Sequence, residues 1–176
     1  MHIVCYPFPE TRYRPDLKPI VIETDKIVVV ALGNRFRADD AAGLEVAARL
    51  NRNIDSVTIV DHATDAFAIV DAWDGAALSV VVDAAVTGAN PGTVHRVEVN
   101  AGLLPKDLSR CSSHGLGVAE AIELAKAMGR LPRKLLIYGI EVKSVTLGEP
   151  LSPEVVKAVA SVARQIDEEI AGPYNR

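Results

Sequence analysis

The stretch KIVVVALGNRFRADDAAGLEVAARL, residues 26–50, carries the pattern from which the fold follows. It opens with a β-branched apolar run of the kind found in a strand that is covered on both faces. The run breaks at Gly33-Asn34, and apolar residues at helical spacing resume after Asp39-Asp40. A buried strand, an acidic turn and a helix, in this order, predict an α/β unit with two carboxylates beyond the carboxyl end of a strand.

The acidic turn indicates which kind of ligand the unit binds. In open α/β sheets, ligands bind in the crevice beyond the carboxyl ends of the strands. A dinucleotide is disfavoured, because the turn lacks the second and third glycines of a phosphate-binding loop and has carboxylates where a phosphate would lie. A cation is the better-matched ligand. We expect Asp40 to contact it and Asp39 to cap the helix that follows.

Length and composition limit the domain organisation and the class of partner. With 176 residues, 49% of them hydrophobic, the chain is expected to form one domain at 26–171, with an N-terminal extension at 1–25 and a tail at 172–176. The net charge of -4, with both signs interspersed, indicates neither a nucleic acid nor an anionic membrane as partner. Without a spanning apolar run or a secretory signal, a cytoplasmic protein is expected, in which Cys5 and Cys111 are reduced thiols.

Further strands and helices alternate along the chain. Strands are expected at 56–60, 77–82, 93–99 and 134–140, and helices at about 68–73, 115–128 and 153–170. Thr64 or Asp65 can cap the first of these helices, and Pro153 suits the first position of the last. The strand at 93–99 alternates polar and apolar residues, which favours an antiparallel edge strand with His95 exposed. The pattern predicts a three-layer α/β/α sandwich around a mostly parallel sheet.

Three residues from separate segments are predicted to meet at one edge of this sheet. Asp40 and Asp83 follow apolar strands, and His114 follows a loop without periodicity at 101–113. Two carboxylate oxygens and one imidazole nitrogen suit nickel, zinc or iron(II), and three protein ligands leave positions open for substrate or water. The alternative is that the acidic residues only cap helices.

Other candidate groups have weaker support from the sequence. His62 lies in a second acidic turn, where a histidine is more often solvated than a ligand, and we leave it outside the site. Cys111 precedes His114 by three residues and allows a Cys/His nucleophile, but no further orienting residue is identifiable. The two serines at 112–113 do not form a nucleophile elbow, because no glycine-flanked serine follows a strand.

Several short motifs together resemble the hydrogenase maturation protease family. The similarity extends from about Lys26 to Ile170 and leaves the N-terminal extension unmatched. The motifs that carry it are Gly33-Asn34 with Asp39-Asp40, Asp83-Ala84-Ala85 with Pro91-Gly92-Thr93, Ser113-His114-Gly115-Leu116-Gly117, Leu135 to Ile140, and Gly148-Glu149-Pro150-Leu151-Ser152-Pro153-Glu154-Val155.

The resemblance implies a fold of the phosphorylase/hydrolase-like kind and a specific activity. It implies an endopeptidase that removes the C-terminal extension of a nickel-iron hydrogenase large-subunit precursor after nickel insertion. Asp40, Asp83 and His114 match the metal-contacting and catalytic positions, and Asn34 and Asp61 are candidates for substrate binding. It also implies that nickel arrives with the precursor, which is the expected partner, and that the metal is not permanently bound. A monomer is expected.

One departure from the family and two alternative functions bear on this interpretation. Many relatives have a glycine-rich Asp-Gly-Gly-Thr turn after the second strand, whereas this chain has Asp61-His62-Ala63-Thr64, which brings side chains toward the crevice. A nickel-dependent assembly factor that binds the loaded subunit without cutting it is one alternative. The other is an α/β hydrolase-like enzyme for a small substrate, which would have a deep apolar pocket beside the acidic edge.

Overall fold

The computed structural model describes residues 26–50, 57–63, 65–99 and 117–172. In these ranges the chain forms a five-stranded sheet, four α-helices and one short 3-10 helix, η1. In chain order the elements are β1 (Ile27–Ala31), η1 (Ala38–Ala41), α1 (Ala42–Arg49), β2 (Val57–Val60), α2 (Ala66–Trp73), β3 (Leu78–Ala85), β4 (Val94–Val99), α3 (Gly117–Met128), β5 (Lys134–Glu141) and α4 (Pro153–Ala171).

The sheet has the strand order β2-β1-β3-β5-β4. Pairing is parallel from β2 through β5, and β4 alone pairs antiparallel, on β5 at the edge. This confirms the predicted mostly parallel sheet with an antiparallel edge strand. β1 is an interior strand, and all five of its residues are buried, as its continuous β-branched run predicts.

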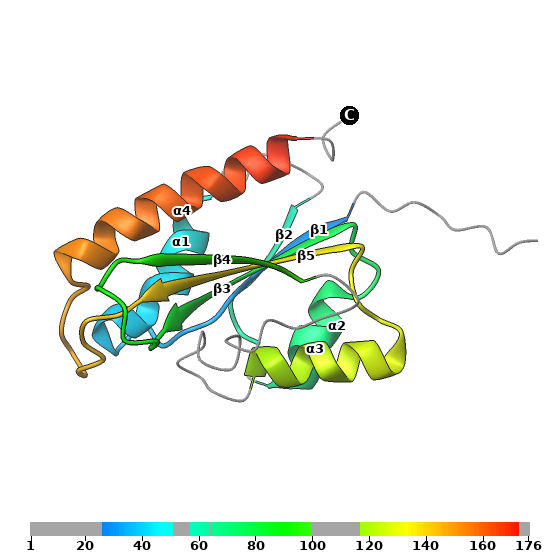
Figure 1. The fold of residues 1–176 in the computed structure, drawn as a ribbon, viewed down its shortest axis with the longest axis horizontal. Coiled ribbons are helices and arrows are strands. Elements are labelled where there is room, and N and C mark those ends of the chain that lie inside the picture. The colour runs from blue at the N-terminus through cyan, green and yellow to red at the C-terminus, as the bar shows by residue number, and fades with distance from the viewer. Residues whose placement is uncertain (1–25, 51–56, 64, 100–116, 173–176) are drawn as a thin grey trace, which may run out of the picture.

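The helices form two layers, one on each face of the sheet (Figure 1). α1 and α4 pack on one face, where Val29, Val82 and Tyr138 belong to the core. α2 and α3 pack on the other face over Val30 and Ile137. Consecutive strand residues thus alternate between two cores, which explains why the strands are apolar throughout. The predicted three-layer α/β/α sandwich is confirmed.

Local signals place the helix ends where the sequence predicts them. Asp65 caps α2, since its Oδ1 accepts a hydrogen bond of 2.9 Å from the Ala68 N–H. Pro153 is the first residue of α4, where its missing N–H costs no hydrogen bond. Within the described residues, no helix combines the length and the apolar character that a membrane span requires.

The third strand differs from its prediction. β3 does not end before Asp83 but continues to Ala85, because β5 also continues and pairs Gly139 with Asp83 and Glu141 with Ala85. Asp83 therefore lies within a strand and is held by a regular ladder. The predicted N-terminal extension and C-terminal tail lie almost entirely outside the described residues, and the domain limits stay a prediction.

Candidate active site

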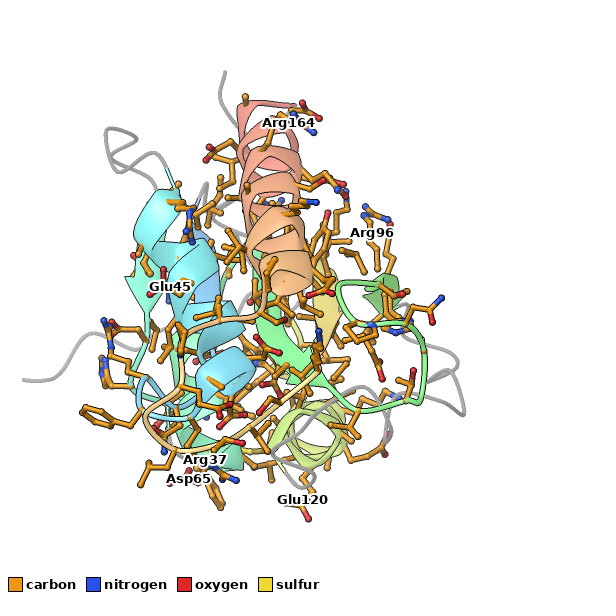
Figure 2. All side chains as sticks on the ribbon, turned by 90° about the vertical axis from the view of Figure 1, so that its left-hand side faces the viewer. Arg37, Glu45, Asp65, Arg96, Glu120 and Arg164 are labelled. Atoms are coloured by element: carbon orange, nitrogen blue, oxygen red, sulfur yellow. The ribbon has the colours of Figure 1, made fainter. Side chains whose placement is uncertain are left out.

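The carboxyl ends of β1, β2, β3 and β5 lie along one edge of the sheet, because these strands are parallel. We call this edge the rim; it is the left-hand side of Figure 1, and Figure 2 looks onto it. Two predicted site residues are located here: Asp40 in η1, which follows β1, and Asp83 near the end of β3. Both carboxylates are buried, with Asp40 2% and Asp83 1% exposed.

A close backbone approach brings the elements that carry these carboxylates together. The Leu32 N–H donates a 2.9 Å hydrogen bond to the carbonyl of Val82, the residue before Asp83. Gly43 of α1 packs against the same two strands, and a Cβ there would lie 2.3 Å from Leu32 O and 2.5 Å from Val82 O. Because only glycine permits this contact, α1 starts directly against the rim, and η1 touches β3. The element that carries Asp40 therefore contacts the strand that carries Asp83.

The turn between β1 and η1 is closed by its own backbone. Gly33 has φ +138°, and a Cβ at this position would lie 2.1 Å from Asp40 O. The Asn34 N–H donates to that same carbonyl at 3.2 Å, and the Asn34 side-chain oxygen accepts from the Phe36 N–H at 2.9 Å. Asn34 therefore shapes the turn that positions Asp40. A direct contact of Asn34 with substrate stays a prediction.

Asp39 does not cap a helix, contrary to the sequence prediction. No side chain caps η1 or α1, and Asp39 is fully buried against the connection between β5 and α4. Its Oδ1 accepts from the Ser152 N–H at 2.6 Å. Its Oδ2 accepts from the N–H groups of Lys143 and Ser144 at 2.9 and 3.1 Å and from the Ser152 hydroxyl at 3.0 Å. The Asp39 carboxylate satisfies backbone donors of a loop that is more than 100 residues away, which local capping rules do not consider.

Asp61 is linked to the acidic turn through an ion pair. Its Oδ2 lies 2.8 Å from Nη2 of Arg35, and both side chains are partly exposed. The neighbouring His62 has a side chain that is 84% exposed, in agreement with its placement outside the site. Asp61 thus lies after β2 at the rim, as predicted, and its proposed contact with substrate stays a prediction.

The third predicted ligand, His114, lies outside the described residues, as do Cys111 and the serines at 112–113. In the parts of the chain that the structure describes, no three His, Cys, Asp or Glu side chains gather closely enough to hold a metal ion. Asp40 and Asp83 alone do not make a three-ligand site. The assignment of His114 as the third ligand stays a prediction.

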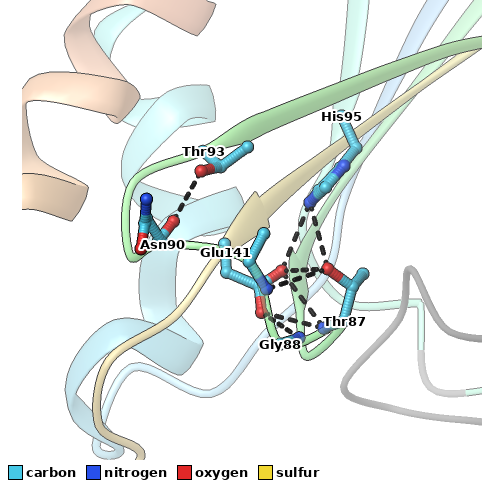
Figure 3. Close-up of polar contacts among 7 residues, drawn as sticks. Thr87, Gly88, Asn90, Thr93, His95 and Glu141 are labelled. Atoms are coloured by element: carbon cyan, nitrogen blue, oxygen red, sulfur yellow. Dashed lines mark hydrogen bonds and ion pairs between the residues drawn. The ribbon is translucent and has the colours of Figure 1, made fainter.

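A further buried carboxylate at the rim, that of Glu141, was not predicted from the sequence. Glu141, the last residue of β5, is 2% exposed. Its carboxylate accepts hydrogen bonds from the N–H groups of Thr87 and Gly88, both at 2.8 Å, and from the Thr87 hydroxyl at 2.9 Å. It also lies 3.2 Å from Nε2 of His95, and Figure 3 shows how these groups surround it. Burial raises the pKa of Glu141, but the hydrogen bonds from Thr87, Gly88 and His95 outweigh it and hold the pKa below its ordinary value.

This group also corrects the expectation for His95. Its side chain is 25% exposed and is bonded to Glu141, so it is not an exposed rung. His95 shares its face of β4 with Val97 and Val99, which pack into the core under α2 and α3. Gly139 pairs with His95 on one side and with Asp83 on the other. The sequence contains a signal for this position. Residues two apart in a strand share a face, so the apolar Val97 and Val99 place His95 on the inward face of β4.

A hollow of about 360 Å³ lies elsewhere, toward the end of α4 that is remote from the rim. Its lining includes Arg96, Tyr138 and Glu169, and Arg96 and Lys134 both pair with Glu169. The hollow is lined by charged side chains and lies away from the acidic edge, so it is not the deep apolar pocket beside that edge that a small-substrate hydrolase would have.

A comparison with family models decides the family. The model described as hydrogenase maturation protease matches residues 44–169. The chain belongs to the hydrogenase maturation protease family. This confirms the resemblance drawn from the short motifs and identifies the protein as a hydrogenase maturation endopeptidase.

Individual relatives of this maturation protease agree in sequence and in fold. The hydrogenase expression/formation protein HupD of Thiocapsa roseopersicina is 30% identical over 152 residues, which cover 83% of this chain and 68% of the relative. The hydrogenase 2 maturation protease of Escherichia coli K12 is 26% identical over 80% of this chain and 88% of its own. The E. coli hydrogenase maturating endopeptidase HybD has a similar fold, with a TM-score of 0.67 at 22% identity over 80% of this chain and 89% of its own. HybD of Thermococcus kodakarensis has a TM-score of 0.62 at 25% identity over 83% and 99% of the two chains.

The rim of this maturation protease has a chemistry suited to bond hydrolysis near a cation. A buried carboxylate attracts a nearby cation more strongly than an exposed one, because its surroundings are less polar than water. A carboxylate can also accept a proton from an attacking water. The anchoring of the acidic turn by Asp39 and the packing of Gly43 hold the Asp40 backbone in place before a substrate binds.

Proposed function

We propose that this protein is the endopeptidase that removes the C-terminal extension from the precursor of a nickel-iron hydrogenase large subunit after nickel has been inserted. Membership of the maturation protease family supports the peptidase activity. The observation that supports the metal-dependent part is the pair of buried carboxylates, Asp40 and Asp83, on two touching elements at the rim.

Nickel in this proposal is cargo of the precursor, and the protein recognises it there. Asp40 and Asp83 would each offer a carboxylate oxygen and His114 an imidazole nitrogen, a donor set that suits a borderline divalent ion such as nickel. Three protein ligands leave positions for the ligands that the precursor itself supplies. Contact with the loaded ion would orient the neighbouring peptide bond against the rim, which lowers the entropic barrier to reaction.

The hydrolysis needs one water and one group that transfers protons. The water oxygen attacks the carbonyl carbon of the scissile bond while Asp40 or Asp83 takes up the water proton. The C–N bond then breaks, and the same proton passes to the leaving amine, so that the carboxylate is regenerated. The products are the mature C-terminus with a free carboxylate and the released extension with a free amine.

The substitution Asp83→Asn tests this function with little disturbance of the fold. Asp83 Oδ1 accepts a 2.8 Å hydrogen bond from the Ala84 N–H, and the amide oxygen of asparagine can accept the same bond. We expect the variant to keep its melting temperature and to lose processing by roughly a hundredfold or more, the effect of removing a proton-transfer group or a metal ligand. Asp71→Asn, at a carboxylate on α2 whose side chain is 70% exposed, is the matched control and is expected to keep full activity.

The measurement is the intact mass of the precursor after incubation with each variant, with and without nickel loaded into the precursor. Shortening of the loaded precursor only, by wild type and Asp71→Asn, supports the proposal. Normal shortening by Asp83→Asn and by His114→Ala would remove the site assignment. Nickel-dependent association with an unchanged precursor mass would instead mean that the protein is a binding-only assembly factor.

A further inference from the structure

In the part of the chain that the structure describes, most of the large exposed apolar side chains lie at the rim. Among the described residues, six large apolar side chains are exposed: Phe36 73%, Phe67 62%, Val86 61%, Met128 45%, Leu147 74% and Val156 42%. Single exposed apolar residues are normal on a soluble protein, but their grouping at one place indicates an interaction surface.

Each of the four parallel strands is followed by one of these side chains. Phe36 follows β1, Phe67 follows β2, Val86 follows β3 and Leu147 follows β5. Because the carboxyl ends of parallel strands share one edge, all four lie around the edge that carries Asp40 and Asp83. Of the other two, Val156 lies near the start of α4, and Met128 ends α3, which leads to the start of β5 at the opposite edge.

The two most exposed side chains belong to loops that are fixed to each other. The Gly148 N–H, next to Leu147, donates a 2.8 Å hydrogen bond to the carbonyl of Phe36. Arg37 Nε donates to Val145 O at 3.4 Å, and Asp39 binds the same connection between β5 and α4. Phe36 and Leu147 therefore project from an ordered double loop, and little conformational entropy would be lost when a partner covers them.

One cation beside this apolar pair has no anionic partner in the described structure. Arg35 is paired with Asp61, and Lys143 with Glu154. Arg37, which follows Phe36, meets no carboxylate of any described residue, and its side chain donates only to the carbonyl of Val145. Arg37 lies in the turn between β1 and η1, at the edge of the sheet onto which Figure 2 looks. The complementary ligand is an apolar segment that carries a carboxylate.

We propose that Phe36, Leu147 and Arg37 form the docking surface for an apolar, carboxylate-bearing segment of the hydrogenase large-subunit precursor. This inference rests on the proposed function, because it assigns to that substrate the surface that adjoins Asp40. Phe36 and Leu147 cover apolar side chains of the precursor, and Arg37 pairs with its carboxylate. The contact holds the precursor at the rim while the bond to be cut lies against the carboxylates.

The test compares Phe36→Ser, Leu147→Ser and Arg37→Gln with Met128→Ser, a matched loss of an exposed apolar side chain away from the rim. We expect KM for the nickel-loaded precursor to rise roughly tenfold for Phe36→Ser and for Leu147→Ser with kcat unchanged, as for central apolar contacts of an interface. Arg37→Gln is expected to raise KM less and to weaken its dependence on salt concentration. Met128→Ser is expected to have wild-type kinetics, and all four variants wild-type melting temperatures.

Direct binding separates failure of this inference from failure of the proposed function. Asp83→Asn is immobilised, and its affinity for the nickel-loaded precursor is measured by surface plasmon resonance with and without Phe36→Ser in the same chain. Weaker binding by the double variant supports the docking surface even if the wild type cuts nothing. Equal binding by the single and double variants, or equal KM for Phe36→Ser and wild type, would overturn it. So would self-association of the wild type that Phe36→Ser abolishes in a sedimentation experiment.

Discussion

The substitution Asp39→Asn distinguishes the role of Asp39 from that of its neighbour Asp40, because it should lower the stability of the protein and leave the chemistry of cleavage unchanged. The Asp39 carboxylate accepts four hydrogen bonds, three of them from the backbone N–H groups of Lys143, Ser144 and Ser152. An asparagine offers one oxygen in place of two. If that oxygen replaces Oδ2, the amide NH₂ faces the Ser152 N–H, which lies 2.6 Å from Oδ1 in the wild type. Two donors would then meet in a buried place.

The magnitude follows from these contacts. One charge-assisted hydrogen bond is lost, worth about 1.5–3 kcal/mol, and the remaining bonds to the side chain weaken because the negative charge is removed. We expect the free energy of unfolding to fall by about 3 kcal/mol, which for a chain of this size lowers the melting temperature by roughly 6–12 °C. Below the melting transition, processing per folded molecule should stay within about threefold of wild type, since Asp39 serves as an anchor of the loop.

Thermal unfolding followed by circular dichroism measures the effect, with Asp61→Asn as control. That control breaks only the exposed pair with Arg35 and should cost less than about 1 kcal/mol. An Asp39→Asn protein that melts with the wild type but no longer processes the precursor would refute the reasoning, because Asp39 would then take part in the chemistry.

Three further substitutions test other parts of the rim and its supports. Glu141→Gln should cost only about 1 kcal/mol, since the Thr87 hydroxyl and the His95 ring can each accept a hydrogen bond from the new amide. Because the pKa of Glu141 is lowered in the folded state, its ionised carboxylate contributes fully to the free energy of unfolding above pH 4.5, the ordinary pKa of the group. This contribution is lost as the pH falls through the folded-state pKa, and urea unfolding of the glutamine variant should lack this acid dependence. Gly43→Ala should lower the free energy of unfolding by about 3 kcal/mol or more and reduce processing, because its Cβ would meet two backbone carbonyls. Gly117→Ala is the control in the same thermal assay and should be tolerated, since the nearest contact of its Cβ would be at 3.6 Å. Asp65→Ala should lower the free energy of unfolding by about 1 kcal/mol and Asp65→Asn by much less, since asparagine is also a good N-cap.

The sequence was a reliable guide where a feature depends on local pattern. Continuous β-branched runs indicated buried parallel strands, and the alternation at 93–99 indicated the antiparallel edge strand. The capping role of Asp65 and the position of Pro153 need only neighbours in the chain; Asp65 was one of the two predicted caps, and the position of Pro153 was predicted. The placement of Asp40 and Asp83 at one edge also follows from local pattern, because parallel strands put their carboxyl ends together.

Features that depend on contacts between distant segments were not predictable in this way. Asp39 looked like a helix cap because its true partners are backbone N–H groups at 143–152, whose approach depends on how the connection between β5 and α4 folds back. Glu141 was not singled out, because the donors that satisfy it, Thr87 and Gly88, belong to another turn. In both cases a single sequence shows a carboxylate and does not show its donors.

The geometry of the acidic turn explains how adjacent aspartates take different roles. In a 3-10 helix consecutive side chains are about 120° apart around the axis, so Asp39 and Asp40 point in different directions. Asp39 uses its whole carboxylate to hold the β5–α4 connection, and this fixes the backbone of the residue that follows it. A separate hydrogen bond across the same junction, from the Gly148 N–H to the Phe36 carbonyl, holds the loops of Phe36 and Leu147 side by side. A structural carboxylate therefore couples the position of the candidate ligand Asp40 to the shape of the proposed docking surface, and weakening Asp39 should disturb precursor affinity before it disturbs the cleavage step.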